Sequence, residues 1–343
     1  MTSTPSWFTE TINNLQFENH TISVLSDLDS TPAQIHYQLF HPPSTTTTKR
    51  CGIVLVHGGG AHSRWWDWTA PYLAADGHLV ACLDLSGQGD SENRDLYAMT
   101  TNAIEVMEVA RALKTKHNAT VPDKPIIIGH SYGGWVTLVV GKNYGTELGG
   151  TIVLDSSVRP SNHPMNKAGP PMRKKKPGTK TKEELKKRFR LMPPQPIINQ
   201  YLLDYIFPLS VTDKRGKWEW KDDAERFSKH VDFKSKTTMN QMAVIQSQRL
   251  RGQKCRLSLL YGEHSLFFED KEVILNHMRK ELEMFPPKGQ IYTPIIMIPN
   301  SHHHLMFDQP LMTVTVLRTI LNEWYASDRL KESTATRMVR SRL

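Results

Sequence analysis

A serine able to act as a nucleophile lies at residue 131, inside a Gly-x-Ser-x-Gly motif at residues 129–133. The β-branched run 126–128 predicts a buried strand, and the apolar run 135–140 predicts a helix. A strand, a sharp turn and a helix with this motif at the turn form a nucleophile elbow, whereas a plain glycine-rich loop would lack the flanking pattern. The elbow would place the Ser131 hydroxyl at the positive end of the helix.

A serine hydroxyl needs a base to accept its proton and a third group to orient that base. Three adjacent histidines, His302, His303 and His304, follow an apolar strand-like run near residue 298. Each is a candidate for the base, and each is equally compatible with a loop residue or a packed ring. A metal-binding tract is less favoured, because neighbours in sequence point in different directions and no cysteine or carboxylate cluster accompanies them.

Four motifs occur in a fixed order: His-Gly-Gly-Gly-Ala-His at 57–62, Asp-Leu-Ser-Gly-Gln-Gly-Asp-Ser at 84–91, the elbow, and the histidine loop before Pro310. Together they resemble the α/β-hydrolase superfamily over about residues 35–325. The resemblance implies a mostly parallel sheet flanked by helices and a serine esterase or lipase-like activity. Because Ser131 occupies the nucleophile position, the carboxylate-nucleophile chemistry of related dehalogenases and epoxide hydrolases is not expected.

The resemblance also indicates which histidine is the base. In similar hydrolases the base is the first histidine of a pair in the last loop, seven residues before a proline. Seven residues before Pro310 is His303. We therefore expect His303 to be the base, with His302 or His304 as the alternative.

The acid has two candidate positions. Hydrolases of this superfamily usually carry an aspartate in a Gly-x-x-Asp turn after the strand that here is 256–261, but this chain has Ser265 at that place and Glu263 two residues earlier. In a second arrangement the acid directly follows the strand after the elbow, which here gives Asp155. We favour Asp155 and keep Glu263 as the alternative. Without a catalytic role, Asp155 would be a residue that caps the strand, and Glu263 would be an exposed carboxylate in a loop.

Backbone N–H donors must stabilise the charge that develops on a carbonyl oxygen under attack. The residue after the nucleophile, Tyr132, supplies one donor. The 57–60 loop resembles the family's His-Gly-Gly-Gly loop and implies a second donor at Gly59, with Gly60 as the next choice, while His57 braces the loop. No metal or organic cofactor is implied.

Strand-like and helix-like stretches alternate up to residue 155, which predicts a parallel sheet wrapped by helices. The region 156–254 is instead rich in proline and basic residues and then helical, so we predict a helical cap insertion there. The core is expected at 20–155 and 255–326, and a mobile C-terminal tail at 327–343. The sequence predicts an antiparallel hairpin at 20–26 and 34–40, strands at 52–56, 78–83, 126–128, 150–154, 256–261 and 292–298, and helices at 65–75, 195–207, 222–248 and 310–325, with another helix capped at Thr101 or Asn102.

The net charge of +9 is concentrated in one segment. Residues 173–190 contain ten Lys or Arg and two Glu, a local net charge of +8. This segment lacks the interleaved aromatic residues of a nucleic-acid site. It is typical of a solvated face, and it offers a way to steer an anionic substrate such as a carboxylate or a coenzyme A thioester.

Two general features limit the class of protein. No apolar run reaches the roughly 18 residues of a membrane span. The three cysteines, Cys51, Cys82 and Cys255, lie in or beside apolar strand-like runs, which favours buried thiols over disulfides or metal ligands.

The motifs predict a serine hydrolase that cleaves a carboxylic ester or thioester through an acyl-enzyme on Ser131. The alternatives are a non-hydrolytic binding protein, or a lyase or acyltransferase on the same fold. The final residues Ser341, Arg342 and Leu343 resemble the Ser-Lys-Leu address read by the peroxisomal import receptor. They predict a peroxisomal location, or a cytoplasmic one if the signal is not read. The chain is also similar to hydrolases of fungal secondary-metabolite pathways, including toxin pathways.

Overall fold

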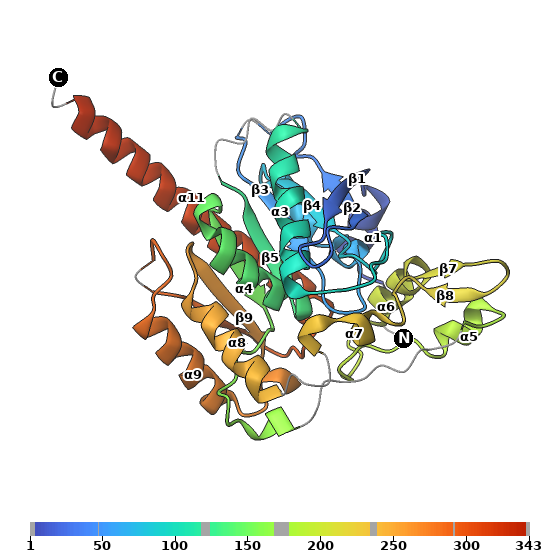
Figure 1. Ribbon diagram of the computed structural model, residues 1–343. Helices are drawn as coiled ribbons and strands as arrows, with labels where there is room; N and C mark the ends of the chain where they lie inside the picture. Colours follow the sequence, from blue (N-terminus) through green and yellow to red (C-terminus); the bar gives the residue numbers. More distant parts are fainter. Residues whose placement is uncertain are drawn as a thin grey trace.

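The computed structural model describes residues 4–46, 48–117, 124–167, 178–233, 239–290 and 292–340. Its main feature is an eight-stranded sheet of order β1-β2-β4-β3-β5-β6-β9-β10 (Figure 1). The strands from β4 to β10 in this order are parallel, whereas β1 and β2 form an antiparallel edge. The predicted α/β architecture is confirmed. The strands are β1 Glu18–Leu25, β2 Pro32–Phe40, β3 Gly52–Val56, β4 Leu79–Leu83, β5 Ile126–His130, β6 Gly150–Leu154, β9 Leu257–Gly262 and β10 Ile295–Ile298.

Helices cover both faces of the sheet, because alternate side chains of its buried strands point to opposite sides. Leu55 and Ile128 belong to a core that includes α1, α2 and α11. Val54 and Ile127 face the other side, where α3 and α4 pack, and α8 and α9 continue that layer over β6 and β9. The helices are α1 Ser6–Asn13, α2 Ala70–Ala75, α3 Met99–Thr115, α4 Tyr132–Tyr144, α8 Met239–Arg251, α9 Lys271–Met284, α10 Leu305–Asp308 and α11 Pro310–Arg340.

The carboxyl ends of four parallel strands meet at one edge of this sheet. The loop 57–60 follows β3, Ser131 follows β5, Asp155 follows β6, and the histidine loop follows β10. Open α/β sheets bind their ligands at this edge. The fold therefore brings the 57–60 loop, Ser131, Asp155 and the histidine loop to one place.

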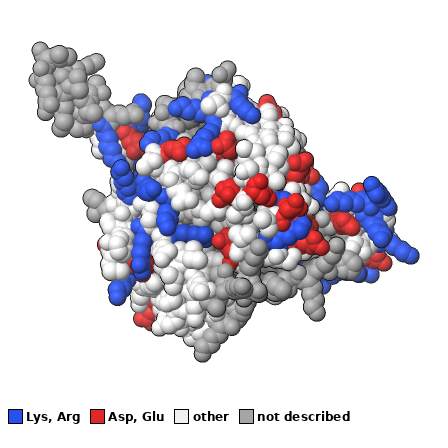
Figure 2. Space-filling view, viewed as in Figure 1, with Lys and Arg blue, Asp and Glu red and all other residues white. Residues whose placement is uncertain are grey.

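The segment between β6 and α8 forms a cap of short elements, α5 Lys182–Lys186, α6 Gln200–Ile206, the hairpin β7 Val211–Asp213 and β8 Trp218–Trp220, and α7 Arg226–Lys229. The predicted single helix at 222–248 is wrong. Its first part instead exchanges main-chain hydrogen bonds with the loop 87–97 of the core, which an uninterrupted helix would not allow. Figure 2 shows basic side chains gathered over the α5, β7 and β8 part of the cap.

Helix α8 lies beside β9 and packs between α4 and α9 (Figure 1), with Leu250 fully buried. These contacts belong to the core. We therefore propose that the cap insertion ends before α8 and not at residue 254.

Other predicted boundaries also differ from the structure. The helix expected at 195–207 begins only at Gln200, and the strand expected at 292–298 begins only at Ile295. The helix expected at 65–75 is split into a 3-10 turn, Ser63–Trp66, and α2. Helix α3 begins at Met99, so that Thr101 and Asn102 lie inside it and do not cap it. Helix α11 continues past residue 325 to Arg340 and extends away from the body (Figure 1), so that residues 327–340 are helical. Among the described residues, no helix has the length and apolar character that crossing a membrane requires.

Candidate active site

The turn between β5 and α4 holds Ser131 at φ 55° and ψ −119°, a backbone conformation that is rare for a residue other than glycine. A Cβ on Gly129 would lie 2.3 Å from the carbonyl oxygen of Gly133. A Cβ on Gly133 would lie 2.4 Å from the carbonyl oxygen of His57. Both glycines of the motif are therefore required by close backbone contacts, and the strained turn projects the serine side chain above the sheet.

Three side chains from three strand ends form a continuous hydrogen-bonded chain. The Oγ of Ser131 lies 2.8 Å from Nε2 of His303, and Nδ1 of His303 lies 2.6 Å from Oδ2 of Asp155. These distances are within hydrogen-bonding range for a nucleophile, a base and the group that orients the base. The structure thus brings together the three residues that the sequence placed 172 and 148 positions apart.

The neighbouring histidines have other partners. The Nδ1 of His302 lies 3.0 Å from Asp308, whose carboxylate also accepts the backbone N–H of His302. The Nε2 of His304 lies 3.2 Å from the carbonyl oxygen of Met192. His302 and His304 therefore contact other groups, and His303 is the histidine that hydrogen-bonds to Ser131.

The carboxylate of Asp155 is fully buried and receives two further hydrogen bonds. The backbone N–H of Gly262 donates to Oδ1 at 2.8 Å, and the Ser265 hydroxyl donates to Oδ2 at 2.5 Å. Ser265 stands where the sequence comparison led us to expect an aspartate. The serine therefore orients the carboxylate that comes from β6. The sequence showed Ser265 only as a departure from the family pattern, and its role as a donor was missed.

The alternative acid, Glu263, has a different role. Its carboxylate accepts the backbone N–H of Asn300 at 2.8 Å and lies 3.7 Å from His264. The hydrogen bond from Asn300 lowers the pKa of Glu263. Glu263 therefore joins two surface loops, while Asp155 contacts His303.

Burial controls the protonation of the base and the acid. It lowers the pKa of His303, so the imidazole is neutral before the reaction and has a free lone pair to accept a proton. Burial raises the pKa of Asp155, whereas the hydrogen bonds from Ser265 and Gly262 lower it. The two donors thus stabilise the ionised carboxylate beside the imidazole.

The candidate oxyanion donors lie on either side of the serine. The N–H of Tyr132 belongs to the first turn of α4, where backbone donors have no partner within the helix. Gly60 is excluded as the second donor, because its N–H donates to Oε1 of Gln88 at 2.6 Å. The N–H of Gly59 has no hydrogen-bond acceptor among the described residues, which favours Gly59 as the second donor.

The 84–91 motif and His57 support this glycine loop. His57 donates from Nδ1 to the carbonyl of Gly58 at 2.8 Å and accepts the N–H of Leu85 at Nε2. Asp84 accepts the backbone N–H groups of Ser63 and Asp90. These residues position the loop and do not face the serine hydroxyl.

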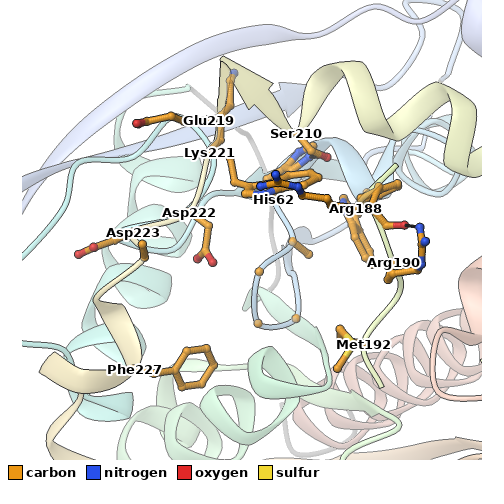
Figure 3. A pocket seen from close by; sticks show the side chains of 18 of the residues that line it. His62, Arg188, Arg190, Met192, Ser210, Glu219, Lys221, Asp222, Asp223 and Phe227 are labelled. Atoms are coloured by element: carbon orange, nitrogen blue, oxygen red, sulfur yellow. Dashed lines mark hydrogen bonds between the residues drawn. The ribbon is translucent and has the colours of Figure 1, made fainter. Parts of the chain in front are cut away.

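A cavity of about 190 Å³ opens above Ser131 between the core and the cap. Its floor is formed by Ser131 and the loop 58–60, and its walls include Trp65 and His304. The cap contributes both charged and apolar side chains (Figure 3). The labelled cap residues are Arg188, Arg190, Met192, Ser210, Glu219, Lys221, Asp222, Asp223 and Phe227.

Two groups of side chains in the described part of the chain have a spacing compatible with a metal ion: His130 with His303 and His304, and His36 with Asp84 and Asp90. In the first group, His303 uses both ring nitrogens for Ser131 and Asp155. In the second, the Asp84 carboxylate already lies 2.7 Å from Nδ1 of His36. Hydrogen bonds within the protein therefore occupy one or more members of each group.

One further network was not foreseen from the sequence. The hydroxyl of Tyr132 donates to Oδ1 of Asn102 at 2.6 Å and lies 2.6 Å from Nε2 of His230. Asn102 belongs to α3, and His230 belongs to the cap. The residue that follows the nucleophile is thus tied to both the core and the cap.

With this geometry, the comparisons with known proteins become informative. The sequence profile of the Alpha/beta hydrolase family matches residues 53–315. The chain belongs to the alpha/beta hydrolase family. That range contains the elbow and the residues that contact it from β3, β6 and β10.

Relatives of this alpha/beta hydrolase include Methylesterase 3 of Arabidopsis thaliana, 24% identical over 79% of this chain and 96% of the relative. Norfluorocurarine synthase 1 of Strychnos nux-vomica is 29% identical, but the match covers only 34% of this chain and 42% of the relative. Among solved structures, the peroxisomal alpha-beta-hydrolase Lpx1 of Saccharomyces cerevisiae has a TM-score of 0.67 at 16% identity, over 90% of this chain and 89% of that one. This last similarity concerns the fold.

Proposed function

We propose that this protein is a serine hydrolase that cleaves a carboxylic ester or thioester. The observation that carries the proposal is the hydrogen-bonded chain from Ser131 through His303 to Asp155 beneath an open cavity. Membership of the alpha/beta hydrolase family and the resemblance to a protein named as a methylesterase support hydrolysis in general. The serine mechanism and the choice between ester and thioester are our proposals.

In the proposed mechanism, Ser131 attacks the acyl carbonyl while Nε2 of His303 accepts its proton. Asp155 holds the imidazole in the tautomer that accepts at Nε2 and stabilises the imidazolium. The N–H groups of Gly59 and Tyr132 donate to the oxygen that becomes negatively charged. His303 then protonates the leaving group, and a water molecule activated by the same histidine hydrolyses the acyl-enzyme.

The substrate specificity is proposed to favour anionic acyl compounds. Arg188, Arg190 and Lys221 line the cavity together with Glu219, Asp222 and Asp223, so the lining itself is mixed in charge. The excess positive charge that would steer an anion comes from the 173–190 segment, to which Arg188 and Arg190 belong. Residues 173–177 lie outside the described residues. If kcat/KM for an anionic ester does not change with ionic strength or on neutralising Lys174, Lys175 and Lys176, this part of the proposal is wrong.

The experiment that tests the proposed function compares the wild type with Ser131→Ala on methyl esters, longer acyl esters and acyl thioesters. We expect hydrolysis of at least one class by the wild type and a loss of about 10⁴-fold in kcat for Ser131→Ala. A variant with full activity would contradict the serine mechanism. An inactive wild type with intact ligand binding would favour a binding protein.

A second function on the same residues is a lyase or acyltransferase. The resemblance to a protein named as a synthase supports this alternative, although the match covers only part of both chains. Product analysis separates the possibilities, because hydrolysis adds the elements of water to the substrate. A lyase or an acyltransferase would give products without that addition.

We also propose that the protein is imported into peroxisomes by the receptor that reads a C-terminal tripeptide. The support is the sequence Ser341-Arg342-Leu343, which lies outside the described residues. When a fluorescent protein is fused to the N-terminus, the fusion should accumulate in peroxisomes. Adding two residues after Leu343 should leave the fusion in the cytoplasm. An unchanged distribution would contradict this location.

A further inference from the structure

Arg226 is a buried cation in the cap. Its side chain is only 2% exposed, although it belongs to the short helix α7. The Nε donates to Asp222 at 3.4 Å, and Nη2 is buried with no hydrogen-bond partner in the described part of the chain. A buried guanidinium with an unsatisfied donor costs folding free energy. This cost suggests a role for Arg226 beyond packing.

The guanidinium lies near Gly59 and near the side-chain ring of Tyr132. Its Nη2 is 3.8 Å from the point that a Cβ on Gly59 would occupy. Its Cζ is 5.6 Å from the ring centre of Tyr132 and 4.6 Å from that of Phe227. From standard bond lengths, Nη2 lies within roughly 6 Å of the Gly59 nitrogen. The positive charge is therefore close to the oxyanion site without lining the cavity.

The cap segment that carries Arg226 is fixed to the core. The N–H of Asp223 donates to the carbonyl of Gly87 at 2.7 Å, and Tyr97 exchanges two backbone hydrogen bonds with residues 229 and 231. His230, four residues after Arg226, contacts the Tyr132 hydroxyl. The guanidinium is thus held in place before a substrate binds, as an electrostatic contribution to catalysis requires.

We propose that Arg226 is a positioning residue of the oxyanion site. Its charge adds positive potential there, and its guanidinium holds the Tyr132 ring in place. This inference rests on the proposed function. A charge within roughly 6 Å of one oxyanion donor, in a partly buried site, stabilises a developing oxyanion because little water screens it. The carboxylate of Asp222 offsets part of this effect. The negative charge forms only during reaction, so Arg226 acts on kcat and not on substrate binding.

The test compares Arg226→Met, which removes the charge but keeps a long side chain, with Arg226→Lys, which keeps the charge. Lys229→Met is the matched control, because it removes a cation from the same helix that pairs with Asp223 at the surface. Each variant is assayed for kcat and KM on an activated ester and for inhibition by phenylboronic acid. This probe forms a tetrahedral adduct with Ser131 Oγ, with the serine proton passing to His303, and so places negative charge near the oxyanion donors.

For Arg226→Met we expect kcat to fall about 30-fold with KM within about twofold, and the boronate inhibition constant to rise by a similar factor. Arg226→Lys should recover most of both losses, and Lys229→Met should resemble the wild type. Asp222→Asn, which removes a carboxylate that pairs with Arg226, should tighten boronate binding about threefold. This last variant tests the charge effect even if Arg226→Met does not fold.

Several results would overturn the inference. If Arg226→Met folds and keeps the wild-type kcat and boronate affinity, the charge has no role. If Arg226→Lys is as impaired as Arg226→Met, the residue acts through its shape alone. If Asp222→Asn weakens boronate binding, the sign of the effect is wrong. Failure of the proposed function is distinguishable, because the wild type itself would then show neither ester hydrolysis nor boronate inhibition.

Discussion

The candidate active site is built from two regions that differ in how they are held. On the core side, Ser131, Asp155 and His303 follow parallel strands, and their positions are set by the sheet. On the cap side, Arg226 and His230 lie on short elements that are fixed by hydrogen bonds to the loop 87–97. In the proposed mechanism, the core therefore carries the groups that exchange protons. The cap carries groups that influence the electrostatic potential and the stability of the site.

This difference predicts unequal effects of mutation. A change on the core side removes a step of the reaction, whereas a change on the cap side alters the electrostatic potential or the stability of the site. The predictions below test this division.

The largest effect is expected for His303→Gln. Without an imidazole to accept the Ser131 proton, kcat should fall about 10⁴-fold or more, measured on the ester that the wild type hydrolyses best. His302→Gln is the matched control on the adjacent residue, which bonds to Asp308, and should lose less than about tenfold. Equal losses in the two variants would show that the base has been misassigned.

The next effect separates the two candidate acids. Asp155→Asn should lower kcat by about 10³-fold to 10⁴-fold, because the amide cannot hold the imidazole in the required tautomer. Glu263→Gln should lower it by less than about threefold, since Glu263 binds the Asn300 backbone and not His303. Activity that survives the first change and is lost with the second would reverse the assignment.

A smaller effect is expected for Ser265→Ala, and it depends on pH. The Ser265 hydroxyl lowers the pKa of Asp155, so its removal should raise that pKa. The active form is the carboxylate, which is lost as the pH falls through its pKa. The acid limb of kcat/KM should therefore move to higher pH by about one unit, with little change at alkaline pH.

Ser265→Thr retains a hydroxyl and serves as the control for that experiment. An acid limb that does not move in Ser265→Ala, or that moves to lower pH, would show that the hydroxyl does not stabilise the carboxylate.

The smallest effect should come from Tyr132→Phe, which cuts the link from the elbow to the cap. It leaves Asn102 and His230 without the hydroxyl between them, and the free energy of unfolding should fall by about 1–2 kcal/mol with kcat within about threefold. Urea denaturation measures the change. Tyr144→Phe, at the other end of α4, is the control and should have little effect. If both variants are equally stable, the link contributes nothing.

The core side of the site was largely predictable from the sequence, whereas the cap side was not. A nucleophile elbow requires glycines at fixed positions, and a strand end followed by Asp155 or by the histidine loop has a recognisable pattern. The choice among three histidines depended on the family resemblance. Ser265 was noticed only because it replaced an expected residue, and its hydrogen bond to Asp155 depends on the pairing of β6 with β9.

Arg226 gave no signal of its own, because it is one of many basic residues in an irregular segment. Its burial results from contacts between residues 221–231 and the loop 87–97, more than 120 positions earlier. The same contacts explain why the helix predicted at 222–248 is interrupted. Long-range main-chain pairing of this kind leaves no periodic pattern in the sequence.

The most direct test of the account is to locate the nucleophile by covalent labelling. The protein is treated with a fluorophosphonate, digested, and its peptides are analysed by mass spectrometry. We predict a single adduct on Ser131 in the wild type, and slow or absent labelling in His303→Gln. An adduct on another residue, or continued ester hydrolysis by a protein that remains unlabelled at Ser131, would contradict the account.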